Sequence, residues 1–154
     1  MLRKMLMVFG AVLALLVSDV CFAQTRFDRA EYLMAAGAGQ KKGKVAKGTL
    51  SFDSEKKLVT FVAGKQSEQF SIGYDTITSM LYEQASRPRY AEAILISPMF
   101  VFAKEKKHFL TIHFNGEGGT PQFVVVHLDK TNYRNALATA EAQTGKKVDR
   151  SLEN

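Results

Sequence analysis

Short segments in which apolar and polar residues alternate run through most of this chain. In "GTLSFD", Leu50 and Phe52 share one face, and in "QFSIGY" so do Phe70 and Ile72. Residues two apart point the same way only in an extended chain, so this period predicts β-strands with one buried face. A chain that repeats the pattern this often is constrained to a mainly β fold.

The predicted strands fall into two groups, followed by a single change of period. The strands are residues 48–53, 57–63, 69–74, 77–85, 107–114 and 121–128. In residues 129–148 the period becomes helical, with Tyr133, Ala136, Leu137 and Ala140 on one face. Asp129 or Thr131 could cap the start of this helix, and Gly145 is a plausible stop. The order predicts an α+β, mainly β domain with one C-terminal helix.

The first residues follow the pattern of a secretory signal. A basic start, "MLRK", precedes the apolar run "MLMVFGAVLALLV", and small residues lie at Cys21 and Ala23. Cleavage near Ala23 would remove the only cysteine, and the mature chain would then lack a disulfide, a cysteine nucleophile and a thiolate ligand. We therefore predict a signal peptide over residues 1–23 and export to the periplasm or the medium. A retained membrane anchor is the alternative.

The next segment reads as a helix and a linker. "TRFDRAEYLMAA" places Phe27, Ala30 and Leu33 at helical spacing, and "GAGQKKGKVAK" is rich in glycine and lysine. We therefore expect a short helix and basic linker over residues 24–44. The domain proper is expected over residues 45–148, with a tail at 149–154.

The order of these elements resembles the pleckstrin-homology-like (PH-like) superfold, as in bacterial PH and GRAM-type domains. The resemblance is carried by "GTLSFD…LVTF", "FSIGYDTITSMLYE" and "FVVVHLDKTNYRNALATAEAQTGKK", and it covers roughly residues 45–147. It implies a seven-stranded antiparallel barrel or sandwich closed by the C-terminal helix. It also implies a binding module rather than an enzyme, since members of the superfold mostly bind lipids, peptides or proteins.

The segment "RPRYAEAILISPMFVFAKEKKH" allows two interpretations. Residues 93–102 could supply the seventh strand as buried core, although Pro98 cannot donate to a sheet ladder. Alternatively, residues 87–107 form an apolar protrusion with basic flanks that contacts an anionic membrane surface or a membrane-associated partner. The candidate contact residues are Arg87, Arg89, Tyr90, Ile94, Leu95, Met99, Phe100, Phe102, Lys104, Lys106 and Lys107.

Other chemistry finds little support in the sequence. His108 and His113 are five residues apart on one predicted strand and point to opposite faces, and His127 is expected opposite Phe109. We therefore predict no metal site, no catalytic residues and no cofactor. The net charge of +6 becomes +5 once Arg3, Lys4 and Asp19 leave with the signal. This charge favours an anionic lipid surface or an envelope protein as partner. Nucleic acid is not expected, because export separates the protein from most of it, while the oligomeric state stays open.

Overall fold

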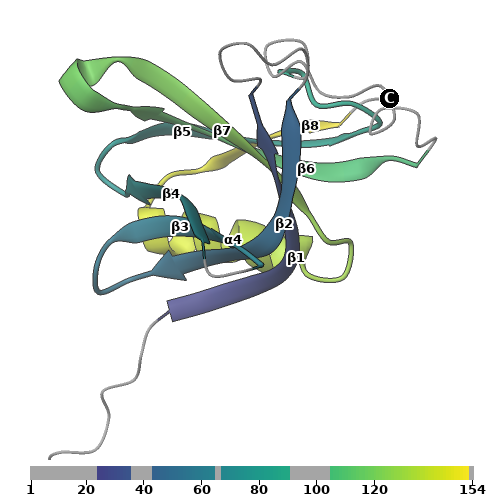
Figure 1. The fold of residues 1–154 in the computed structure, drawn as a ribbon, viewed down its shortest axis with the longest axis horizontal. Coiled ribbons are helices and arrows are strands. Elements are labelled where there is room, and N and C mark those ends of the chain that lie inside the picture. Colours follow the sequence, from purple (N-terminus) through teal and green to yellow (C-terminus); the bar gives the residue numbers. More distant parts are fainter. Residues whose placement is uncertain (1–23, 36–42, 65–66, 91–104, 153–154) are drawn as a thin grey trace, which may run out of the picture.

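The computed structural model describes residues 24–35, 43–64, 67–90 and 105–152. These residues form one eight-stranded sheet that folds around a shared core, with a helix along its open side (Figure 1). The strands are β1 (Gln24–Met34), β2 (Lys44–Asp53), β3 (Leu58–Ala63), β4 (Ser67–Gly73), β5 (Ile77–Ala85), β6 (Lys107–Asn115), β7 (Pro121–Leu128) and β8 (Val148–Leu152). The helix α4 spans Tyr133–Thr144, and a short 3₁₀ turn, η1, spans Glu117–Gly119.

The strand order is β4-β3-β2-β1-β7-β6-β5-β8. Strands β1 to β7 pair antiparallel, and β8 pairs parallel with β5. Strand β1 joins the two halves, since it pairs with β2 along most of its length and with β7 over Glu31, Tyr32 and Leu33. The predicted α+β, mainly β architecture with one C-terminal helix is therefore confirmed.

The segment predicted as an N-terminal helix is strand β1. Its ladder with β2 shifts register between Phe27 and Ala30, and Arg29 inside this bulge has φ of 59°. The bulge lets Phe27 and Ala30 both face the main core, although they are three residues apart. Leu33 packs in a separate cluster of buried residues. The bulge thus gives the buried residues of β1 a spacing of three, which resembles the period of a helix. The sheet therefore begins at Gln24 rather than near Val45.

Within the part of the chain that the structure describes, the seventh antiparallel strand is β1. Strands β5 and β6 pair directly, with Ala85 opposite Lys107. Residues 93–102 lie outside the described residues. The predicted tail at 149–154 is also corrected in part, because Val148–Leu152 forms β8 along the edge of β5. Strand β8 has little signal in the sequence, because two of its five residues are charged.

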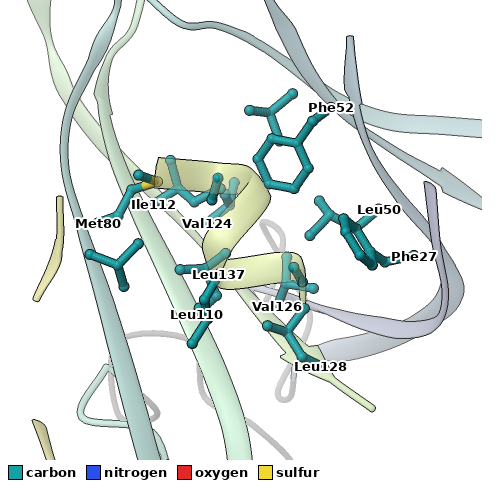
Figure 2. Close-up of a cluster of buried hydrophobic side chains, with 14 of the residues drawn as sticks. Phe27, Leu50, Phe52, Met80, Leu110, Ile112, Val124, Val126, Leu128 and Leu137 are labelled. Carbon is teal, nitrogen blue, oxygen red and sulfur yellow. The ribbon is translucent and has the colours of Figure 1, made fainter. Parts of the chain in front are cut away.

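The main core lies between the folded sheet and α4 (Figure 2). Ala136, Leu137 and Ala140 form the buried face of the helix, as predicted, and Leu137 is 2% exposed. It lies among branched side chains of the sheet such as Leu110 and Val126. The helix ends at Gly145, whose φ of 70° suits glycine and whose amide bonds to the carbonyl of Glu141.

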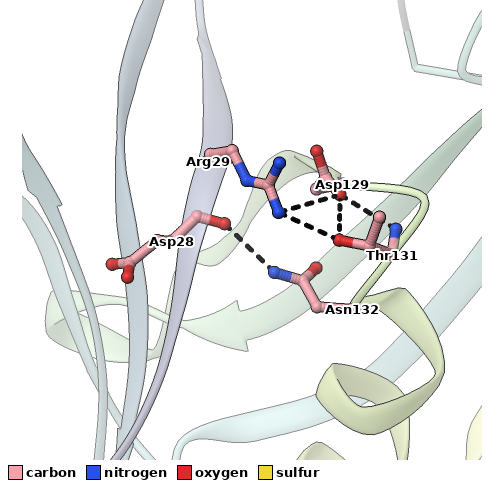
Figure 3. A network of polar contacts seen from close by, with 5 residues as sticks. All are labelled: Asp28, Arg29, Asp129, Thr131 and Asn132. Atoms are coloured by element: carbon pink, nitrogen blue, oxygen red, sulfur yellow. Dashed lines mark hydrogen bonds and ion pairs between the residues drawn. The ribbon is translucent and has the colours of Figure 1, made fainter.

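The start of α4 is fixed by the bulge of β1 (Figure 3). A guanidinium N–H of Arg29 donates to Thr131 Oγ1 at 3.1 Å and lies 3.7 Å from Asp129 Oδ1. The amide of Asn132 donates to the carbonyl of Asp28 at 3.1 Å. Asn132 is the N-cap residue rather than Asp129 or Thr131, while Asp129 Oδ1 accepts the backbone N–H of Thr131 at 2.9 Å.

Candidate functional site

The connection between β5 and β6 is long for two strands that pair directly. It runs over residues 86–106, yet its ends are the register partners Ala85 and Lys107. Hairpin connections usually have about 2–5 residues, so this one is far longer than the two paired strands require. We call residues 86–106 the β5–β6 connection. It contains or adjoins all residues predicted to contact a membrane or partner.

The structure describes both ends of this connection. Of the predicted contact residues it places Arg87, Arg89, Tyr90, Lys106 and Lys107. The others, Ile94, Leu95, Met99, Phe100, Phe102 and Lys104, lie outside the described residues. Arg87 and Lys106 are exposed and Lys107 is half-buried. All three belong to the end of the sheet at which β5 stops and β6 begins.

Arg89 anchors the start of the connection to the sheet. Its Nε lies 3.3 Å from Glu83 Oε1, and its backbone N–H donates to Glu83 Oε2 at 3.2 Å. A guanidinium N–H also donates to Ser151 Oγ on β8 at 3.0 Å. Glu83 is only 5% exposed, so Arg89 supplies the partner that a buried carboxylate requires. The positive charge of Arg89 is therefore paired with the Glu83 carboxylate of the same chain. A cavity of about 240 Å³ beside this pair is lined by Glu83, Ala85, Arg87, Arg89 and Ser151.

Tyr90, in a turn beyond β5, packs against a second group of buried side chains. Its ring centroid is 5.2 Å from that of His113 on β6 and 4.9 Å from that of Phe123 on β7. These two residues alternate with the core-facing Ile112 and Val124, so Tyr90 covers the face of the sheet turned away from the main core. The sequence suggested an aromatic ring at a membrane edge. The structure gives Tyr90 an anchoring contact with His113 and Phe123, and its contact with a membrane stays a prediction.

This second face of the sheet is apolar, which is unusual for a face turned away from the core. Leu33, Phe109 and Val125 are all buried there and form a cluster of their own. Thr111 between them is also fully buried, and its Oγ1 has no hydrogen-bond partner. A cavity of about 350 Å³ opens at one side and is lined by Tyr32, Leu33, Ala35, Pro121, Gln122, Phe123 and Val125. The only sequence signal for this second buried face was the unbroken apolar run of β7.

The three histidines are structural in the part of the chain that is described. His127 lies opposite Phe109, as predicted, and its Nδ1 is 3.1 Å from Glu31 Oε2. Burial lowers the pKa of His127, while the Glu31 carboxylate acts in the opposite direction. The sequence missed Glu31, because β1 was predicted as a helix. No group of three or more His, Cys, Asp or Glu that could hold a metal occurs among the described residues.

His108 belongs to an aromatic stack between the sheet and α4. The Tyr82 hydroxyl lies 2.7 Å from His108 Nδ1, and the His108 ring stacks on Tyr133 with centroids 3.7 Å apart. Burial lowers the pKa of His108, and the neighbouring His127 and Arg134 lower it further. Burial likewise raises the pKa of the Tyr82 hydroxyl. The stack therefore favours neutral rings at neutral pH.

Comparison with known proteins defines the fold alone. No protein-family model matches this sequence, and no curated protein matches it significantly. Among solved structures, a chain of the "Structure of the Spt16D Pob3N heterodimer" matches with a TM-score of 0.52 at 8% sequence identity. The match covers 86% of this chain and 56% of the other, so the present chain spans little more than half of that protein's length. It supports the PH-like fold at a coarse level. No helix among the described residues is long and apolar enough to cross a membrane.

Proposed function

We propose that this chain is an exported, non-enzymatic binding module of the PH-like type that contacts an anionic membrane surface through residues 87–107. One observation carries the proposal. Seven antiparallel strands and the closing helix α4 complete the fold from described residues, without the apolar segment 93–102. The sheet of the described residues is therefore complete without a strand from that segment.

The composition of the connection suits a membrane surface. Burial of a Phe or Ile side chain contributes about 1.5–3 kcal/mol, and a basic residue near an anionic leaflet about 1 kcal/mol. Phe100, Phe102 and Ile94 would supply the apolar contribution, and Lys106 and Lys107 at its end the charge. Arg89 and Tyr90 contribute differently, since their contacts hold the start of the connection against the sheet.

The alternative is a module for a protein or small ligand in which residues 93–102 are buried as core. The apolar second face of the sheet, with Leu33, Phe109 and Val125, favours this alternative. The anchored Tyr90 brings the chain to that face directly before the apolar segment. The two functions predict opposite effects of the same substitutions.

The test is the double variant Phe100→Ser, Phe102→Ser. For a membrane contact we expect weaker binding to phosphatidylglycerol-containing vesicles and an unchanged midpoint of chemical unfolding. The second double variant, Lys106→Gln, Lys107→Gln, should weaken the same binding mainly at low salt, because salt screens the charge contribution. A loss of several kcal/mol of stability in the Phe variant, as for large core truncations, would instead identify the segment as core and end the membrane proposal.

A further inference from the structure

Basic side chains from three elements meet at the end of the sheet where the β5–β6 connection departs. The ladder between β6 and β7 ends with the pair His108 and Leu128. Lys106 and Lys107 directly precede this pair on one side, and Lys130 follows it on the other. Lys106 and Lys130 are exposed and Lys107 is half-buried. Residues distant in sequence thus extend the charge of the connection across the ends of two strands.

The first turn of α4 adds a fourth basic residue. The stacking of Tyr133 on His108, with centroids 3.7 Å apart, places the start of the helix against the start of β6. The Arg134 Nε–H donates to the Tyr133 hydroxyl at 3.0 Å, so the exposed guanidinium is held beside this stack. We call Lys106, Lys107, Lys130 and Arg134 the basic end.

The acidic groups nearby offset only part of this charge. Among the described residues they are Glu105, which is exposed, Asp129, which already lies within the Arg29 and Thr131 network of Figure 3, and Glu31, which already pairs with His127 and Lys47. The amino end of α4 adds a partial positive charge of its own, about half an elementary charge. The basic end therefore carries a net positive charge next to the flank of an apolar segment.

The opposite end of α4 provides a natural comparison. Lys56, Lys57 and Lys146 line a shallow depression there, together with Asp75. The carbonyl end of the helix contributes a partial negative charge at this place. Because α4 has 12 residues, the two ends are about 18 Å apart. The two basic groups can thus be altered separately.

We propose that the basic end is a second part of the membrane contact and fixes the orientation of the domain, with the ends of β6 and β7 and the first turn of α4 facing an anionic lipid surface. The inference rests on the proposed function and extends it to Lys130 and Arg134, which lie outside the predicted segment. An apolar insertion alone would leave the domain free to rotate about it. Charges on both sides of the connection restrict that rotation.

The experiment compares two double variants that each remove two positive charges. Lys130→Gln, Arg134→Gln alters the basic end, and Lys56→Gln, Lys146→Gln is the matched control at the other end of α4. Binding is measured by sedimentation with vesicles of phosphatidylglycerol and phosphatidylcholine at low salt. We expect the first variant to bind roughly tenfold to thirtyfold more weakly, and the control to bind within about twofold of the wild type.

Arg134 contacts Tyr133, so the single variant Lys130→Glu and its control Lys56→Glu repeat the comparison without touching the stack. Equal losses in both members of each pair would show that net charge alone matters, which overturns the orientation and leaves the proposed function intact. If the basic-end variants bind the vesicles as well as the wild type, the orientation is also overturned and the proposed function stays intact. If the wild type fails to bind the anionic vesicles at all, the proposed function and this inference both fall.

Discussion

Leu137 is the side chain through which α4 closes the core, and it is 2% exposed. We predict that Leu137→Ala lowers the free energy of unfolding by about 2–5 kcal/mol, the usual range for truncation of a buried leucine. Urea denaturation followed by circular dichroism measures this. The exposed Lys147 lies just beyond the helix, and Lys147→Ala should change stability by less than about 0.5 kcal/mol. Equal midpoints for the two variants would contradict the closing role of α4.

His108 predicts how stability responds to acid. Burial lowers its pKa in the folded protein below the value of 6.5 expected when unfolded. The unfolded chain therefore binds the proton more readily, and the contribution of the neutral, stacked ring is lost as the pH falls through and below 6.5. The ionisable groups that face it are Tyr82, Tyr133, His127 and Arg134.

The measurement is the free energy of unfolding at pH 7.5 and pH 5.5 for the wild type and His108→Gln. We expect stability to decrease toward pH 5.5 in both proteins, because His113 and His127 also have lowered pKa values. The decrease should be smaller in the variant. An equal or larger decrease would mean that His108 does not contribute to the acid sensitivity.

Several residues could be assigned from sequence because their signals are local. Gly145 ends α4 since a glycine after a helical period is the simplest αL cap, and Phe109 faces His127 since the hairpin length fixes the register. The partner of His127 could not be assigned in this way. Glu31 lies on a strand that the sequence presents as a helix, so no local pattern connects the two.

At the level of elements, β1 matters most because it lies in the middle of the sheet and pairs with both β2 and β7. We predict that a chain beginning at Lys44, close to the start expected from sequence, fails to fold. Its β2 and β7 would each lose a partner, and the core would lose Phe27 and Ala30. Heteronuclear NMR spectra test this. A chain beginning at Gln24 should give dispersed amide signals, and a dispersed spectrum from the shorter chain would contradict the role of β1.

The strands recovered from sequence are β2 to β7, whose alternation or unbroken apolar runs are local signals. Strands β1 and β8 were not predicted, for different physical reasons. The bulge at Arg29 changed the spacing of buried residues in β1, and β8 is held mainly by a parallel ladder to the distant β5. Within the candidate site, the position of the connection between β5 and β6 was predictable from the flanking strands. The anchoring of Arg89 was not, since it depends on the buried Glu83 and on Ser151 of β8.

At the scale of the whole molecule, the sheet begins directly after the predicted cleavage site of the signal peptide. Gln24 already pairs with Asp53, so cleavage after Ala23 would leave every residue of the sheet in place. We predict that the exported protein begins at Gln24 and, having lost Cys21, contains no thiol. N-terminal sequencing and thiol titration with a chromogenic disulfide reagent test this. A mature chain that begins at Met1 and retains one thiol would identify the segment as an anchor.

The pairing of β1 with β7 also has a consequence for how the chain acquires its structure. Glu31 lies opposite His127, so this ladder joins two of the most separated parts of the sequence. Contacts of such high contact order form slowly, and a chain emerging from its amino end cannot make them until its last quarter has appeared. Until then one edge of β1 remains open to other chains. A chaperone that holds the nascent protein should therefore recognise β1, and release from it should coincide with the arrival of β7 and α4.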